Sequence, residues 1–400
     1  SNAYLNSNLT EEVYIRQPEG FIDSKNSNKV LKLNKAIYGL NLRSGREWNN
    51  TLDTALKTLG FNPCKSEPCL YVKQVGKEYS YIAVYVDDLI LACPREEEIT
   101  NIKRILRSKF KLHDGNTLKF FLGFEIEREG KTGAISVCQK KYIKELLSVY
   151  GVNSCRPVST PLDPGFQISC NDKNCSKVDI TNYQSLIGSL MYLAISTRPD
   201  IMHAVSLLAQ RNHDPHSEHE AGAKHVLRYL SKTVDLKLYY HKSEKPVEGY
   251  ADADWASNNT DRKSYTGYSF FLAGSTFSWQ SKKQDVVALS STEAEYIALC
   301  TAAKEAVYLR RLLKEVGCSS EKPILLKADN ISAIQISKNP IFHKRTKHID
   351  IKYHYIRDVV DRREIELEYV STNENVSDIF TKNLQKQKHV KFVEMLGLKY

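Results

Sequence analysis

The sequence lacks any apolar run long enough to cross a membrane, because a spanning helix needs about 18 or more consecutive apolar residues. The most apolar stretch, YIAVYVDDLILAC, carries two aspartates at its centre. The sequence also shows no short apolar stretch of the kind that marks a secretory signal peptide. We therefore expect a protein that has no membrane partner and is not secreted.

Cysteine is sparse and irregularly placed, with nine residues in all. Two pairs, Cys64/Cys69 and Cys170/Cys175, have four intervening residues, which is wider than the CxxC pairs of a zinc ribbon. An odd number at scattered spacings also disfavours a disulfide framework. We expect reduced thiols, as in cytosolic or nuclear proteins.

Tryptophan and methionine are rare, with three residues each, whereas tyrosine is abundant with 23. A tyrosine ring offers a stacking face and a polar tip, so it suits phosphate-rich surfaces as well as cores. Lysine and arginine number 57 against 47 acidic residues, which leaves a net charge of +10. This balance favours a polyanionic partner such as nucleic acid.

The chain of 400 residues is too long for one ordinary domain, and about 150 residues per domain predicts two or three. In the last third, three strands precede a helix–strand–helix–strand order, which predicts an α+β fold. The polar, proline-containing segment Arg156–Lys177 is interpreted as a flexible linker. The predicted strands are Leu70–Val75, Tyr79–Ala92, Leu118–Glu127, Ala134–Gln139, Val247–Ala253, Tyr265–Leu272, Ser275–Ser281, Ile324–Ala328 and Ile365–Val370, and the predicted helices are Trp48–Leu59, Asn101–Phe110, Lys141–Tyr150, Asn182–Ala194, Ile201–Gln210, Glu218–Lys232, Ser291–Val316, one from Asn330, and Arg345–Asp361.

Four carboxylates lie where the predicted elements of the last third begin or end: Asp252, Glu295, Asp329 and Asp378. Adjacent strands can bring two of them together, and a helix across the sheet can add a third. Clustered carboxylates repel one another unless cations neutralise them. The hard cation that prefers oxygen ligands and serves phosphate chemistry is Mg²⁺, and two such ions would support phosphodiester cleavage.

Each carboxylate also has a purely structural alternative. Glu295 completes a capping box with Thr292. Asp252 can be a solvated strand end, and Asp254 competes for its role. The other two alternatives are helix capping by Asp329 ahead of Asn330 and favourable first-turn charge at Asp378.

Several motifs occur in order between residues 248 and 384: YADADWASNNTDRKSYTGYSFFLAGSTFSWQSKKQDVVALSSTEAEYIAL, LKADNISAI, RTKHIDIKYHYIRD and NVSDIFTK. This segment resembles the ribonuclease H domain of copia-type LTR retrotransposon polyproteins. The resemblance implies that the four carboxylates named above occupy the family's D-E-D-D metal positions, and it favours Glu295 over the adjacent Glu293. It also implies Mg²⁺ as cofactor, with Mn²⁺ as a substitute. Bacterial enzymes of this type carry a mobile histidine before the final aspartate, whereas the loop Val370–Ser377 has none.

Basic residues accompany these motifs and suit phosphate contact, because positioning on a duplex depends mostly on its backbone. The alternative is a solvated helix face. The histidines at 343, 348 and 354 do not share one helix face, so a zinc site is rejected. The predicted nucleic-acid-binding residues are Arg262, Lys263, Lys282, Lys283, Lys344, Arg345, Lys347 and His348, and the basic run also includes His343 and Lys352.

Tyr85-Val86-Asp87-Asp88 lies between two apolar strands, where paired aspartates are costly unless something binds them. The motif resembles the YVDD hairpin of reverse transcriptases. The segments EEVYIRQPEGF, KLNKAIYGL, LYV, FLGFEI, STPL and SLIGSLMYLAISTRPDIMHAVSLLAQ also resemble the copia-type polymerase and the helices that follow it. The resemblance implies that Asp87 and Asp88 are metal ligands.

Two departures from the polymerase pattern stand out. The third aspartate that a polymerase needs to hold two ions would fall before the first residue. The segment 41–48, NLRSGREW, replaces the family's K-Q-x-P-R-x-W and is one residue longer. We therefore expect no DNA polymerisation by this chain alone.

The resemblance implies a multidomain α+β protein: a truncated reverse-transcriptase palm at 1–139, a helical thumb or connection at 140–244, and a ribonuclease H-like domain at 245–400 with a mixed five-stranded sheet and flanking helices. The expected activity is cleavage of RNA in RNA–DNA hybrids. The alternative is a domesticated, non-catalytic protein that binds nucleic acid or protein. Expected partners are an RNA–DNA hybrid or other nucleic acid, a second copy of the chain, or other element-encoded proteins, in the cytoplasm (within a virus-like particle) or the nucleus.

Overall fold

The computed structural model describes residues 3–6, 9, 11–113, 115, 117–152, 155–168, 176–256, 261–318, 321–338 and 354–400, with backbone only at 41–44. The chain forms two compact units. Unit 1 comprises Ser1–Thr117 with Arg311–Ser319, and unit 2 comprises Leu118–Arg310 with Ser320–Tyr400. No helix in the described ranges is long and apolar enough to cross a membrane.

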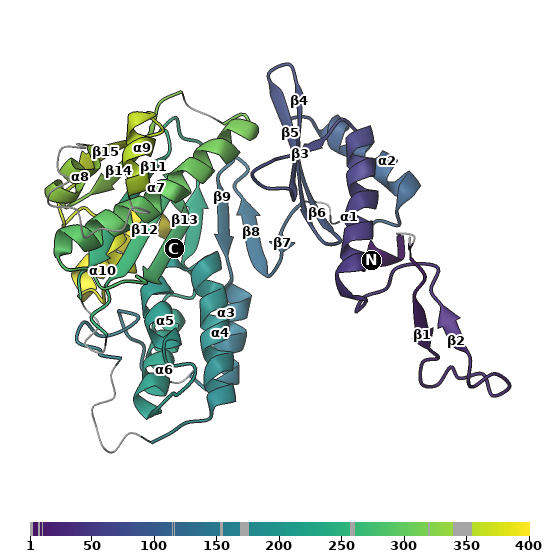
Figure 1. The fold of residues 1–400 in the computed structure, drawn as a ribbon, viewed down its shortest axis with the longest axis horizontal. Coiled ribbons are helices and arrows are strands. Elements are labelled where there is room, and N and C mark those ends of the chain that lie inside the picture. Colours follow the sequence, from purple (N-terminus) through teal and green to yellow (C-terminus); the bar gives the residue numbers. More distant parts are fainter. Residues whose placement is uncertain are drawn as a thin grey trace. The chain divides into compact units, whose positions relative to one another are not determined.

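Unit 1 has a four-stranded antiparallel sheet in the order β3-β4-β5-β6 (Figure 1). Trp48, Leu52 and Leu56 recur every four residues along helix α1 and are buried, as one face of a helix requires. Both helices begin earlier than predicted, and three glutamates in the first turn of α2 fit its positive end. The elements are η1 (Ala3–Asn6), β1 (Tyr14–Arg16), β2 (Val30–Lys32), α1 (Asn41–Thr58), β3 (Asn62–Pro63), β4 (Leu70–Val75), β5 (Glu78–Tyr85), β6 (Asp88–Ala92) and α2 (Glu96–Lys109).

The main sheet of unit 2 has five strands in the order β13-β12-β11-β14-β15. The first three strands pair antiparallel, and β14 and β15 continue the sheet in parallel with β11. The predicted α+β class with a mixed five-stranded sheet is confirmed. The elements are β11 (Glu248–Asp254), β12 (Tyr265–Leu272), β13 (Ser275–Lys283), α7 (Ser291–Glu315), β14 (Ile324–Ala328), α8 (Ile331–Lys338), α9 (Tyr355–Asp361), β15 (Ile365–Tyr369), the 3-10 helix η5 (Val376–Phe380) and α10 (Lys386–Met395).

A second five-stranded sheet in unit 2 has the order β16-β10-β9-β8-β7 and is antiparallel. It joins strands from all three of the domains suggested by the sequence. The boundaries of that three-part division therefore remain a prediction. The strands β10 and β16 were not predicted, because two to four residues give little periodicity. The strands are β7 (Phe120–Phe121), β8 (Phe124–Arg128), β9 (Ile135–Cys138), β10 (Lys237–Tyr240) and β16 (Leu398–Lys399).

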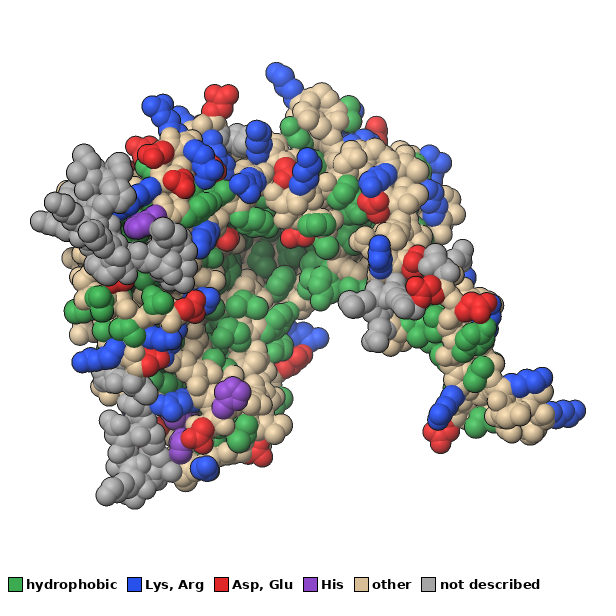
Figure 2. Space-filling model, in the orientation of Figure 1, with side chains coloured by type: hydrophobic (Ala, Val, Ile, Leu, Met, Phe, Trp, Pro, Cys, Tyr) green, Lys and Arg blue, Asp and Glu red, His purple; other side chains and the backbone are tan. Residues whose placement is uncertain are grey.

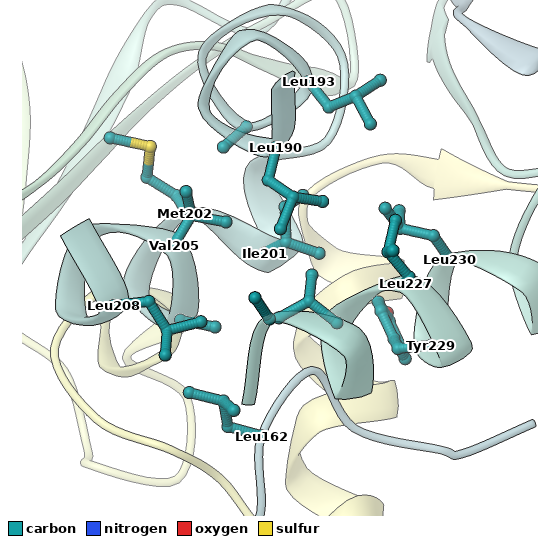
Figure 3. Close-up of a cluster of buried hydrophobic side chains, with 14 of the residues drawn as sticks. Leu162, Leu190, Leu193, Ile201, Met202, Val205, Leu208, Leu227, Tyr229 and Leu230 are labelled. Carbon is teal, nitrogen blue, oxygen red and sulfur yellow. The ribbon is translucent and has the colours of Figure 1, made fainter. Parts of the chain in front are cut away.

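The helices between β9 and β10 in the sequence share a buried apolar cluster, part of which is shown in Figure 3. Leu162 and Ile168 belong to it, so the described part of the predicted flexible linker packs against the helices, and that prediction was wrong for 156–168. The cause is two apolar side chains within a mainly polar segment. The helices are α3 (Lys140–Val149), α4 (Ile180–Ser196), η2 (Pro199–Ile201), α5 (Met202–Ala209) and α6 (Ser217–Lys232).

A buried ion pair lies beside this cluster. The Arg198 guanidinium donates to both Asp200 oxygens, at 2.9 and 2.7 Å, and both side chains are almost fully buried. The Tyr229 hydroxyl donates to Asp200 at 2.6 Å, and His389 lies 3.0 Å from that hydroxyl. Burial lowers the pKa of His389 to about 4. The pair therefore links η2, α6 and α10 through one satisfied polar network.

We predict that Arg198→Met lowers the free energy of unfolding by about 3–5 kcal/mol, because it leaves Asp200 buried without its partner charge. Urea unfolding measures the loss. The control is Lys140→Met, which removes the exposed Lys140–Asp235 pair at 2.5 Å and should leave stability unchanged within error. Equal losses in the two variants would contradict the role given to the buried pair.

Candidate active site

Strand pairing brings two of the predicted carboxylates to the same end of the main sheet, on two neighbouring inner strands. Strands β11 and β14 are parallel, with Tyr250 opposite Lys327. Asp252 and Asp329 each follow this pair by two residues, so they lie at neighbouring positions, with Asp252 still within β11 and Asp329 directly after β14. The buried hydrophobic residues fix the positions of both strands. The strand register then determines where the two aspartates lie.

Glu295 completes a group of three carboxylates. One oxygen from each of Asp252, Glu295 and Asp329 lies within 4.8 Å of the others. Asp252 is 1% exposed and Glu295 6% exposed, whereas Asp329 is half-buried. The first turns of α7 deliver Glu295 from outside the sheet. Asp254 is not a member of this group.

The structural alternatives for two of these residues do not hold. The capping pair at the start of α7 is Ser290 with Glu293: Ser290 Oγ accepts from the Glu293 backbone N–H at 3.2 Å, and Glu293 accepts from the Leu289 backbone N–H at 2.8 Å. Glu295 is therefore not needed for capping. Similarly, Asn330 caps α8 by accepting from the Ala333 backbone N–H at 2.9 Å, which leaves Asp329 for the site.

Burial and mutual repulsion perturb the carboxylates. Burial, with the charges of Asp378 and Asp329, raises the pKa of Asp252 to about 8, although Lys382 and Thr381 oppose the shift. Burial and the charges of Asp252 and Asp329 raise the pKa of Glu295 well above its usual range. Such shifts mark a site that favours either a proton or a bound cation.

The donor set fits a divalent metal ion. All three groups offer carboxylate oxygens, the ligands that Mg²⁺ and Mn²⁺ prefer. Glu295 Oε2 is buried and accepts no hydrogen bond within the described structure. A buried carboxylate oxygen without a partner is costly, and a bound cation would remove that cost.

Asp378, the fourth predicted carboxylate, is not part of this group. It lies in η5, fully buried, and pairs with Lys382 at 2.8 Å and with Lys388. Lys382 Nζ also lies 3.9 Å from Asp252 Oδ2. Thr381 donates to Asp252, so η5 packs directly against the end of β11.

A glycine permits this close packing of η5. Gly267 pairs with Asp252 across β11 and β12, and a Cβ there would lie 2.7 Å from Phe380 Cβ and 2.9 Å from the Ser377 carbonyl oxygen. The close approach leaves no space for a larger residue. The sequence interpretation missed the two lysines beside Asp378, although Lys382 follows it by four residues, the spacing of an ion pair on a helix.

The four predicted basic residues in the described ranges lie at the same end of the sheet as the carboxylates. Lys283 is opposite Tyr265 and Lys282 opposite Thr266, while Asp254 is also opposite Tyr265. Lys283 pairs with Asp261 at 2.8 Å. The other two residues of the four, Arg262 and Lys263, directly precede β12. The other four predicted residues, Lys344, Arg345, Lys347 and His348, lie outside the described residues.

Basic side chains do not form one separate patch on the face drawn in Figure 2, where Lys and Arg lie among Asp and Glu. The predicted nucleic-acid-binding residues in the described ranges form a local group at one end of the main sheet.

Asp87 and Asp88 lie at an exposed hairpin turn between β5 and β6. Val86 has a φ of 54°, in a left-handed region that β-branched residues rarely adopt. Trp48 Nε1 donates to the Val86 carbonyl at 2.6 Å and so supports the turn. Within the described residues, neither aspartate belongs to a group of three side chains that could hold a metal ion.

Comparison with known proteins places the chain in a family. Residues 1–164 match the reverse transcriptase (RNA-dependent DNA polymerase) family. The chain is 38% identical to the retrovirus-related Pol polyprotein from transposon TNT 1-94 of Nicotiana tabacum, over 99% of the chain and 30% of that protein. It is 34% identical to a Saccharomyces cerevisiae protein named for transposon Ty5-1, over 76% of the chain and 98% of that protein.

The chain belongs to the copia-type retrotransposon Pol family. The resemblance in the sequence motifs is thus confirmed. A third relative, the Pol polyprotein from transposon RE1 of Arabidopsis thaliana, is 38% identical over the whole chain and 27% of that protein. The chain therefore spans less than a third of these two plant Pol polyproteins.

Solved structures similar to parts of this Pol chain include LC11-RNase H1 in complex with an RNA/DNA hybrid. That structure is 14% identical, with a TM-score of 0.25, over 34% of this chain and 94% of that one. The foamy viral protease-reverse transcriptase in complex with double-stranded DNA is 13% identical, with a TM-score of 0.21, over 88% of this chain and 54% of that one.

We predict that Mg²⁺ binding releases protons at about pH 7 and progressively fewer as the pH rises, because the ion binds ionised carboxylates and the pKa values of Asp252 and Glu295 are both raised. Below those pKa values protons compete with the ion, so Mg²⁺ affinity should rise with pH and level off above them. Calorimetry in buffers of different ionisation enthalpy measures the release. Asp252→Asn removes one titrating ligand and should weaken both Mg²⁺ binding and the proton release. Proton uptake, or release independent of pH, would contradict the assignment.

Proposed function

We propose that this Pol chain cleaves the RNA strand of RNA–DNA hybrids by divalent-metal-dependent hydrolysis. The observation that supports it is the convergence of Asp252, Glu295 and Asp329, with a buried Glu295 oxygen that has no hydrogen-bond partner in the described structure. The four basic residues at the same end of the sheet support a phosphate-rich substrate. Family membership supports a nucleic acid as that substrate.

The carboxylates would hold the metal, and the chain would orient the substrate. A bound divalent ion supplies activation of water and neutralisation of charge on the phosphate. In the hydrolysis, the water oxygen forms a bond to phosphorus, the bond from phosphorus to a ribose oxygen breaks, and that oxygen takes up a proton. Lys282 and Arg262 would contact neighbouring phosphates, which fixes the register of the duplex.

Two ions, Mg²⁺ or Mn²⁺, are the full form of this proposal. The first would be held by Asp252, Glu295 and Asp329. The second would need Asp252 together with Asp378, so all four carboxylates would serve catalysis. Residues 1–139 would form the palm and 140–244 the helical thumb or connection. Together with the nuclease part at 245–400, they would support the hybrid inside a virus-like particle or the nucleus.

The first test compares two glutamates on the same turn of α7. Glu295→Gln should abolish cleavage of labelled RNA–DNA hybrid in Mg²⁺, with a loss of at least about 10³-fold, since a metal ligand is removed. Glu293→Gln is the matched control: it alters the helix cap and should keep cleavage within about tenfold, because capping affects stability by only about 1 kcal/mol. Cleavage assays and thermal unfolding separate the two effects.

The non-catalytic alternative is supported by one observation: Asp378 is already paired with two lysines. On that alternative, hybrid would bind with a steep dependence on salt concentration and remain uncut. Binding titrations at several salt concentrations, run beside the cleavage assay, distinguish the two functions. Binding without cleavage in either metal would reject the nuclease proposal.

We further predict that this chain alone does not polymerise DNA. Asp87 and Asp88 are exposed at the β5–β6 turn and, within the described residues, lack a third carboxylate beside them, whereas polymerases hold two ions with three. Primer extension on an RNA template measures the activity. Incorporation above background that Asp87→Asn removes would contradict this prediction.

A further inference from the structure

Lys382 lies between two buried carboxylates. Its Nζ is 2.8 Å from Asp378 Oδ1 and 3.9 Å from Asp252 Oδ2. The side chains of Asp378 and Asp252 are 0% and 2% exposed, while that of Lys382 is 35% exposed. The Lys382 ammonium therefore lies between Asp252, which belongs to the group of three carboxylates, and Asp378, which does not.

The other carboxylate oxygen of Asp378, Oδ2, also has a lysine partner. Lys388 pairs with Asp378 Oδ2 and lies 5.2 Å from the Phe392 ring centroid. Among the ion pairs of the described residues, Lys388 contacts only Asp378 and does not reach Asp252. The two lysines thus differ in one respect, because only Lys382 spans both carboxylates.

Charge balance favours one ion. Asp252, Glu295, Asp329 and Asp378 carry four negative charges when ionised, and Lys382 and Lys388 carry two positive charges. A single divalent ion at the group of three would bring the site to neutrality. A second divalent ion would leave two surplus positive charges in a largely buried region, which is unfavourable unless a lysine leaves.

We propose that Lys382 occupies the second cation position, so the substrate-free protein binds one divalent ion and admits a second only by displacing this side chain. The inference rests on the metal centre of the proposed function. Lys382 would be a positioning residue that sets the number of bound ions. Its partly exposed side chain can move toward solvent, whereas the two aspartates are held by β11 and η5.

The experiment counts bound Mn²⁺ in the full chain by electron paramagnetic resonance of the free ion. The unmodified chain should bind one Mn²⁺, with a second site at least about tenfold weaker, because like charges close together repel strongly. Lys382→Gln should bind two ions with affinities within about tenfold of each other. Lys388→Gln removes the same charge from Asp378 but not from beside Asp252, so it should keep one dominant site.

Lys382→Arg retains the charge and should also keep one dominant site. This variant separates loss of charge from loss of folding, and thermal unfolding is recorded for all four chains. Two equivalent sites in the unmodified chain, or an equal gain in Lys388→Gln and Lys382→Gln, would overturn the inference. Those results would leave the metal centre intact. Absence of Mn²⁺ binding in every chain would instead overturn the metal centre and this inference with it.

Discussion

The parallel pairing of β11 with β14 is the constraint on which the candidate site depends. It sets Asp252 and Asp329 two residues beyond the same register pair, and the pairing of β11 with β12 holds Asp252 in the sheet. Everything else at the site adjusts to that position. Helix α7 brings Glu295 over the strand ends, and η5 closes against β11 where Gly267 leaves room.

Buried charge creates the same physical problem twice in unit 2, with two different solutions. Asp200 is fully neutralised by Arg198, whose planar guanidinium satisfies both of its oxygens and leaves nothing for a ligand. That network stabilises the packing of the helices. Asp252 has a lysine at 3.9 Å, a threonine hydroxyl and the Asn375 amide at 3.4 Å, and its neighbours are also acidic. Burial, together with these acidic neighbours, raises its pKa, which marks the group as a candidate site for a cation.

Unit 1 presents its two aspartates differently. The β5–β6 turn exposes Asp87 and Asp88 and strains Val86, with the Trp48 indole as support for the turn. Exposed carboxylates are stabilised by water, so the turn needs no cation to exist. The carboxylates at the main sheet of unit 2 are buried, so they need a proton or a cation to offset their charge. The two acidic motifs, both evident in the sequence, therefore differ in their need for a bound cation.

The sequence by itself determined the α+β class, the family and the candidate carboxylates, because strand and helix periodicity and the order of motifs are local properties. Helix starts were missed where acidic first turns, as in α2, carried the signal, and the two-residue strand β16 left no periodic pattern. The resemblance favoured Glu295 over Glu293, and the tertiary structure agrees, since the packing of α7 brings Glu295 to Asp252 and Asp329. Only the tertiary structure decided that Asp378 pairs with two lysines, because the contact with Lys388 depends on how η5 and α10 pack; the sequence showed only the i,i+4 spacing of Lys382.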